Sequence, residues 1–344
     1  MTDDGRHTVM DPKVGIHCIT YNQEPFIAQT LESMLCQKTD FPIAVYVSDD
    51  CSTDNTPGII SQYAERYPDK VIPLSNPGRK GVIRNFIDTA KVISTEYVAV
   101  CEGDDYWTDP YKLQKQVDAL EAHPEAAVCF HPVTVHWEDG AFSDSEFPSP
   151  EYRFNKNVLD LSDLLRRNFI QTNSVMYRWR YHTTPFEHFP DDILPCDWFL
   201  HMLHAQVGKI LFLPDNMGVY RRHKGGLWYE SMKTARWFKS CGIKHYRFYE
   251  EAEKAFGADF SENKKRMLML SYAHALAQHD DAWLETLRSR YPVDESEFQH
   301  LRWKFLLLSA AMPFIRGRRR EHMHRKKGDY KELLRIFQQA GMNL

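Results

Sequence analysis

The sequence lacks paired cysteines. Its seven cysteines are scattered over 344 residues, and none belongs to a Cys-x-x-Cys pair. This odd and dispersed set does not provide the framework of a disulfide-stabilised secreted protein, and no spacing matches a zinc site. We therefore expect reduced core cysteines in a reducing compartment.

Long apolar runs and a strong net charge are also missing. No apolar run reaches the length of a transmembrane helix, and the polar segment 1–12 lacks the apolar core of a signal peptide. The net charge of −4 gives no reason to expect a polyanion as partner. These absences predict a cytoplasmic protein that does not bind nucleic acid.

Short apolar runs alternate with amphipathic stretches up to about residue 228. This alternation is typical of an α/β fold with a mainly parallel, doubly wound sheet. The acidic, Ser/Pro-rich segment 137–153 is expected to be a mobile surface loop. The expected strands are 14–19, 43–47, 71–74, 97–101, 127–135, 174–178, 210–213 and 218–220.

Beyond residue 228 the strand signals vanish and helical patterns dominate. We predict an N-terminal tail at 1–12, an α/β domain at 13–229, and a helical C-terminal region at 230–344. Within the last region, a largely apolar stretch from residue 301 precedes a basic cluster that ends at residue 327. This pattern suits an anionic inner-membrane surface, and an ordinary helix packed on the protein is the alternative.

Three acids follow the apolar strand at 97–101. Glu102, Asp104 and Asp105 stand where open α/β sheets bind their ligands, at the carboxyl end of a strand. Neighbouring carboxylates repel one another, and a divalent cation is the simplest counter-charge. The alternative is an acidic flank that the dipole of the following helix stabilises.

Further charged groups occupy comparable positions. Asp49 and Asp50 end the strand at 43–47, Asp197 begins a helix, and a basic and imidazole cluster, Arg221 to His223, follows the strand at 218–220. Right-handed crossovers would bring such strand ends to one edge of the sheet.

Together these segments resemble the inverting family 2 glycosyltransferases, which have the GT-A fold. The resemblance covers about residues 12–228 and follows the family's order. It rests on Ile19–Asn22, Val47–Thr56, Glu102–Asp105, Cys196–Trp198 and Tyr220–His223. It implies a GT-A (Rossmann-like) domain with a nucleotide-binding half at about 13–125 and an acceptor half at about 126–229.

The resemblance also implies a nucleotide site. Thr20 and Tyr21 would line the base and ribose pocket, and Asp50, with Asp49 beside it, would accept a hydrogen bond from the base. Both acids could instead form the turn in which they lie. Arg84, the first choice among the nearby cations, would approach the diphosphate, and a solvated surface position is its alternative.

In the same family the acidic turn binds Mn²⁺ or Mg²⁺. Asp104 would be a ligand, and His223 would complete the metal or diphosphate site. Glu102 stands where the family has Asp and would face the ribose or a metal-bound water. Asp105 would orient the sugar hydroxyls, and Arg222 would bind the phosphates.

Asp197 matches the family's general base, which takes the proton from the acceptor hydroxyl. The family has an acid where this chain has Cys196. Asp197 could also be a helix cap. Nucleophilic catalysis by Cys196 ranks below general-base catalysis, because no histidine is placed to activate it.

The resemblance therefore implies a metal-dependent inverting glycosyltransferase. It would use a nucleotide-sugar donor, first of all a UDP-sugar, and a hydroxyl acceptor on a glycan or lipid-linked glycan, in bacterial surface polysaccharide synthesis. The alternative is a non-catalytic nucleotide-sugar or glycan-binding protein on the same fold. A nucleotidyltransferase ranks last, because the loop after the first strand is not Gly-rich.

Overall fold

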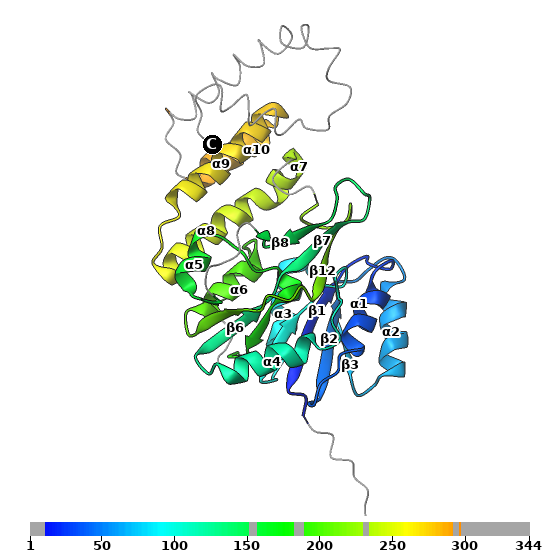
Figure 1. The fold of residues 1–344 in the computed structure, drawn as a ribbon. Coiled ribbons are helices and arrows are strands. Elements are labelled where there is room, and N and C mark those ends of the chain that lie inside the picture. The colour runs from blue at the N-terminus through cyan, green and yellow to red at the C-terminus, as the bar shows by residue number, and fades with distance from the viewer. Residues whose placement is uncertain (1–10, 151–156, 182–188, 230–233, 292–295, 297–344) are drawn as a thin grey trace, which may run out of the picture. The chain divides into compact units, whose positions relative to one another are not determined.

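The computed structural model describes residues 11–150, 157–181, 189–229, 234–291 and 296. The contacts divide the chain into two units, Met1–Tyr229 and Glu230–Leu344, and each is described by itself (Figure 1).

An eight-stranded sheet forms the centre of the first unit. Four of its seven strand pairings are parallel, whereas β10 and β9 run antiparallel to their neighbours. The α/β class is thereby confirmed, with a mixed sheet. In spatial order the strands are β3 (Val71–Leu74), β2 (Ile43–Asp49), β1 (Val14–Thr20), β4 (Tyr97–Val100), β10 (Met176–Arg178), β6 (Ala126–Phe130), β11 (Lys209–Phe212) and β9 (Val158–Leu159).

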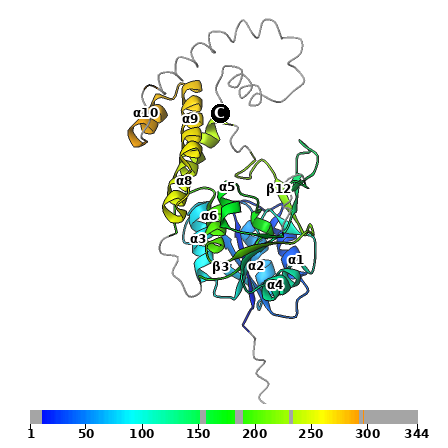
Figure 2. The same ribbon diagram turned by 60° about the vertical axis from the view of Figure 1, so that its left-hand side comes forward.

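Helices cover both faces of this sheet because its strands are apolar on both sides. From β1, Ile16 packs with Leu31 and Leu113 in the core under the first helix layer. The next residue, His17, points the other way and meets the Phe86 ring at 4.4 Å. Figure 2 shows the two layers on opposite sides of the sheet. One layer holds α1 (Ile27–Leu35), α2 (Thr56–Arg66) and α4 (Lys112–Ala122), and the other holds α3 (Val82–Val92) and α6 (Cys196–Ala205), with α5 (Leu161–Arg166) beside α6.

A second, four-stranded sheet was not expected from the sequence. It consists of β5 (Tyr106–Trp107), β12 (Gly218–Arg222), β7 (Val133–Trp137) and β8 (Ser145–Phe147), in that order. The expected strand 127–135 is therefore two strands in two sheets. The chain changes sheets at Pro132, which has no N–H to donate to a ladder.

Two other expectations are corrected by the same sheet. The segment 218–220 was expected at the end of the main sheet, but β12 pairs with β5 and β7 instead. Part of the expected loop 137–153 is the strand β8, which pairs with β7. Strands as short as these leave little periodicity of apolar and polar residues in the sequence.

In the second unit, every described element is helical. The elements are α7 (Ala235–Trp237), a π-helical segment at Phe238–Gly242, α8 (Ile243–Phe256), α9 (Ser261–Ala277) and α10 (Asp281–Arg290). Gly257 ends α8 in the left-handed region, at φ 65°. No helix within the described ranges has both the length and the apolarity to cross a membrane. The stretch 301–327, for which membrane contact is predicted, lies outside the described residues.

Candidate active site

The site is built around the turn that follows β4, residues 102–105, hereafter the acid turn. Its backbone is held against β1, because Gly103 N–H donates to Ile19 O at 2.9 Å. A side chain at Gly103 would not fit, since a Cβ there would lie 2.7 Å from Thr20 Cβ. On the other side, the Thr30 hydroxyl of α1 donates to Asp105 O at 2.6 Å. Two separate elements, β1 and α1, thus fix the turn.

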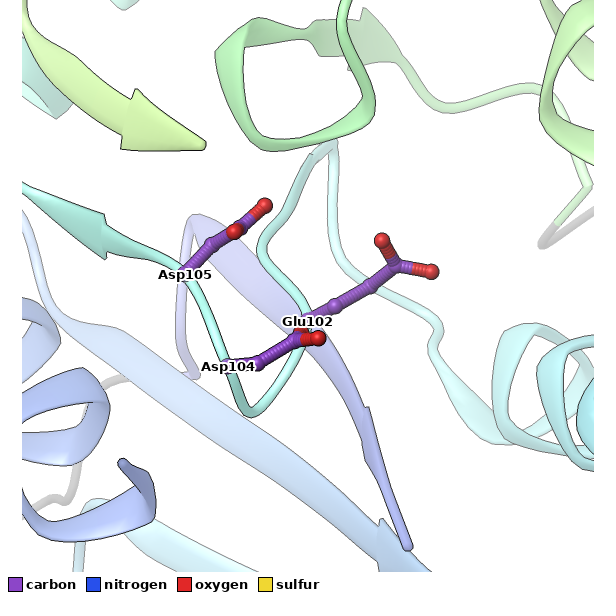
Figure 3. A group of neighbouring side chains, drawn as sticks. All are labelled: Glu102, Asp104 and Asp105. Carbon is purple, nitrogen blue, oxygen red and sulfur yellow. The ribbon is translucent and has the colours of Figure 1, made fainter. Parts of the chain in front are cut away.

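The acid turn brings three carboxylates together. One oxygen each from Glu102, Asp104 and Asp105 lies within 4.8 Å of the others, and Figure 3 shows the side chains projecting to the same side. Burial, followed by the neighbouring charge of Asp104, raises the pKa of Asp105 well above its ordinary range. Burial and the charges of Asp104 and Asp197 likewise raise the pKa of Glu102.

This donor set fits a hard divalent cation. Carboxylate oxygens are the ligands that Mg²⁺ and Mn²⁺ prefer. Asp105 Oδ2 is buried and accepts no hydrogen bond from any described residue. A buried oxygen without a donor costs free energy, which a cation would offset.

Basic groups from β12 face the acid turn. His223 Nε2 lies 2.9 Å from Asp104 Oδ2, so the structure brings together the two residues expected at the metal. The Arg221 backbone N–H donates to Asp105 Oδ1, and its guanidinium donates to Asp104 O, each at 2.9 Å. Arg221 also forms an ion pair with Glu138 at 2.8 Å. Sequence reasoning assigned no role to Arg221, although it is the buried counter-charge of the site.

A cavity of about 270 Å³ opens beside the acid turn. Its walls come from the end of β1, the loop after β3, the acid turn, and the residues that follow β12. Most of the predicted site residues meet here: Thr20, Tyr21, Asp50, Glu102, Asp104, Arg222 and His223 line it, together with Arg79, Trp228 and Tyr229.

Within this cavity, Arg79 and Tyr21 form a stacked pair. The Arg79 guanidinium lies 3.9 Å from the centre of the Tyr21 ring. Asp50 is buried next to them and fixes the loop that carries Arg79, because its two oxygens accept from the backbone N–H groups of Lys80 and Gly81 at 2.7 and 2.8 Å. Because the two groups are already in contact, a planar base would stack on an outer face of this Tyr21–Arg79 pair.

Three residues predicted for the nucleotide-sugar site, Asp49, Arg84 and Asp105, do not line this cavity. Asp49 accepts from Ser52 N at 2.9 Å, which is the turn-forming role given as its alternative. Arg84 is half exposed and pairs with Asp88 at 3.1 Å and with Asp191 at 4.0 Å. The structure therefore puts Arg79, rather than Arg84, beside the other site residues.

Asp197 lies in the first turn of α6. The N-cap of this helix is Pro195, so Asp197 is not its N-cap. The Thr172 hydroxyl donates to Asp197 Oδ2 at 2.7 Å, and the backbone N–H of Trp198 also donates to this carboxylate. Burial raises the pKa of Asp197, and the hydrogen bond from Thr172 opposes this rise. The charge of Asp197 in turn raises the pKa of Glu102, so the two carboxylates are close enough to interact.

These features define a class of protein. At the carboxyl edge of a GT-A-type sheet lie a cavity lined by a cationic–aromatic pair and a cluster of carboxylates beside it. A separate carboxylate, that of Asp197, lies in the first turn of α6. The model of the family described as "Glycosyl transferase family 2" matches residues 16–193. The chain belongs to this family, and the fold and family expected from the sequence are confirmed.

Known relatives agree with this assignment. The chain is 48% identical over 225 residues to the uncharacterized protein Rv1520 of Mycobacterium tuberculosis, covering 65% of this chain and 63% of that protein's length. It is 33% identical to the dTDP-rhamnosyl transferase RfbG of Shigella flexneri, over 67% of this chain and 80% of RfbG. Among solved structures, the mannosyltransferase PcManGT of Pyrobaculum calidifontis, in complex with GDP-Man and Mn²⁺, has the same fold. Its TM-score is 0.53 at 19% identity, covering 89% of this chain and 80% of that one.

Proposed function

We propose that the protein is a metal-dependent inverting glycosyltransferase that moves a sugar from a nucleotide donor to a hydroxyl group of a glycan or lipid-linked glycan. The observation that carries this proposal is the position of Asp197. The Thr172 hydroxyl holds the Asp197 carboxylate by a hydrogen bond. The charge of Asp197 acts on Glu102, an acid-turn residue that lines the cavity. A proton acceptor therefore lies within electrostatic range of the acid turn, which would hold the donor.

The donor nucleotide would occupy the cavity. Its base would stack on the Tyr21–Arg79 pair, beside Asp50, which keeps lone pairs that can accept a base N–H. Uracil and thymine present the same N–H between two carbonyl groups, so one site suits both bases. UDP-sugars remain the first candidates, and the name of RfbG, a dTDP-rhamnosyl transferase, supports testing dTDP-sugars beside them.

Asp104 and His223 would hold Mn²⁺ or Mg²⁺, with Glu102 and Asp105 close by. When bound, the cation supplies positive charge against the diphosphate leaving group. Arg222 lines the same cavity and would add a guanidinium to the phosphate oxygens. The GDP-Man and Mn²⁺ in the name of the PcManGT complex support the choice of ion.

The chemical step is a single displacement. Asp197 takes the proton from the acceptor hydroxyl while the hydroxyl oxygen forms a bond to the anomeric carbon. The bond from that carbon to the diphosphate oxygen breaks, and the nucleoside diphosphate leaves with the electron pair. Because attack comes from the face opposite the leaving group, the anomeric configuration inverts.

We place this reaction in bacterial surface polysaccharide synthesis, at the cytoplasmic side of the membrane. The support is the family itself, together with a relative whose name describes transfer to a polymer, the poly(ribitol-phosphate) beta-N-acetylglucosaminyltransferase TarS. The match to Rv1520 covers 63% of the length of that protein, so the activity of the whole protein is part of this proposal.

Thermal shift with UDP-, dTDP-, GDP- and CMP-sugars, each with and without Mn²⁺, tests the donor. Stabilisation by one nucleotide that depends on Mn²⁺ is expected, and no stabilisation by any of them would refute donor binding. Asp197→Asn should then keep donor binding and lose sugar transfer. A wild-type protein that binds donor but transfers no sugar to any acceptor would favour the non-catalytic binding protein.

A further inference from the structure

Three aromatic side chains gather beside the donor cavity, on the hairpin of β7 and β8 and at the end of the loop after β12. Trp137 ends β7, and its ring lies 4.7 Å from the ring of Phe142 and 5.7 Å from that of Tyr229. Phe142 is 59% exposed, which is unusual for a phenylalanine. We call Trp137, Phe142 and Tyr229 the aromatic surface. Figure 1 shows β7, β8 and β12 side by side, in agreement with their pairing.

The aromatic surface is continuous with the cavity. Arg222 pairs with Trp137 in the register of β12 and β7, and its guanidinium lies 5.3 Å from the centre of that ring. Arg222 and Tyr229 both line the donor cavity. A ligand on the aromatic surface would therefore lie next to the bound donor.

The hairpin that carries Trp137 and Phe142 is acidic, whereas the basic groups Arg222 and Lys224 approach it from β12 and the loop after it. Residues 137–150 contain four carboxylates and neither Lys nor Arg. Asp144 is held by His136 at 2.8 Å, and Asp139 accepts from the Tyr229 hydroxyl. A carboxylate has about four acceptor positions, so each keeps room for further hydrogen-bond donors.

We propose that the aromatic surface binds a neutral sugar unit of the acceptor. This inference rests on the proposed function and narrows its acceptor class. The C–H faces of a pyranose ring are apolar and pack on aromatic rings, while its hydroxyl groups donate to carboxylates such as Asp139 and Asp144. The carboxylates of the hairpin repel phosphate groups, and Arg222 would be engaged by the donor diphosphate, so an acceptor whose repeating units carry phosphate does not suit this surface.

Phe142→Ala tests the proposal with the least risk to folding, because the side chain is mostly exposed. Tyr111→Ala is the matched control, since Tyr111 is a 48% exposed aromatic at the start of α4 and does not line the cavity. Saturation-transfer NMR on the full chain would use methyl glycosides of glucose, galactose, mannose and rhamnose as neutral probes. Ribitol 5-phosphate would be the anionic probe.

At least one neutral glycoside should receive saturation from the wild type and from Tyr111→Ala, with about a fivefold weaker signal from Phe142→Ala, the size of one lost aromatic contact. Ribitol 5-phosphate should give less signal than the best neutral probe. Equal signals from the wild type and Phe142→Ala, no saturation transfer to any neutral glycoside, or preferred binding of ribitol 5-phosphate would each overturn the proposal. Thermal shift with donor and Mn²⁺ on the same proteins reports separately on the proposed function.

Discussion

Removing the hydroxyl group of Thr172 should impair the proposed base without touching the donor. Thr172→Val keeps the shape of the side chain but removes the hydrogen bond of 2.7 Å to Asp197 Oδ2. Thr172 is buried, so water does not readily replace the lost donor. It acts as a positioning residue, because it contacts the base rather than the reacting atoms.

The size of the effect follows from the kind of bond that is lost. A hydrogen bond to a charged group is worth about 1.5–3 kcal/mol, and about 1.4 kcal/mol corresponds to a factor of ten. Burial already raises the pKa of Asp197, and the Thr172 hydroxyl opposes that rise by stabilising the ionised form. The valine variant should therefore have a still higher pKa at Asp197. On the acid limb of the pH profile, at pH values below the pKa of Asp197, the transfer rate of this variant should be about tenfold or more below that of the wild type.

The assay is the pH dependence of kcat for sugar transfer. A base must be ionised to act, so activity is present above its pKa and is lost as the pH falls through it. Thr172→Val should move this acid limb to higher pH, whereas Thr172→Ser, which keeps the hydroxyl, should leave it near the wild-type position. A valine profile that superimposes on the wild type, or that shifts to lower pH, would refute the assignment of Asp197.

Three further predictions concern the donor side of the site. Asp104→Asn and His223→Ala should each abolish the Mn²⁺-dependent thermal stabilisation by donor, whereas Asp49→Asn, in a turn outside the cavity, should retain it; persistent stabilisation in both site variants would place the metal elsewhere. Arg79→Ala should weaken nucleotide affinity about fivefold by calorimetry, whereas Arg84→Ala should not; the reverse order would exclude stacking of the base on the Tyr21–Arg79 pair. Mn²⁺ binding should release protons, because the raised pKa values of Glu102 and Asp105 keep these carboxyls partly protonated until a cation favours their ionised forms. Calorimetry in buffers of different ionisation enthalpy measures this release, which should shrink in Glu102→Gln, and proton uptake instead would contradict the raised pKa values.

Local patterns in the sequence were sufficient for seven of the eight strands of the central sheet, and only β9 (Val158–Leu159) was not expected. Strands such as β1 and β4 are short apolar runs that end in polar residues, and helix α3 begins and ends where its amphipathic pattern does. The second sheet escaped prediction because its strands are short and come from distant parts of the chain. Nothing local indicates that β5, of two residues, pairs with β12 about 110 residues later.

The candidate site divides in the same way. Asp50, Asp104 and Asp197 could be selected because they follow strands or begin a helix and match a family pattern. Thr172 and Arg79 could not be singled out, because their roles depend on which loop lies against which. Arg84 was preferred to Arg79 although its own helix supplies a partner, Asp88, at the i+4 position. The i+4 spacing of Arg84 and Asp88 was the one local signal against a role for Arg84 at the diphosphate.

Strand register explains why the acids of the turn have counter-charges at all. β5 follows the acid turn directly and pairs antiparallel with β12, with Val219 opposite Tyr106. Continuing this register beyond the ladder sets Arg221 opposite Asp104, as its contacts with Asp104 and Asp105 require. A slip of one residue would reverse which side chains face the turn. The charge balance of the site is therefore a property of the pairing of β5 with β12, which explains why charge patterns along the sequence could suggest the cluster but could not identify Arg221 as its buried member.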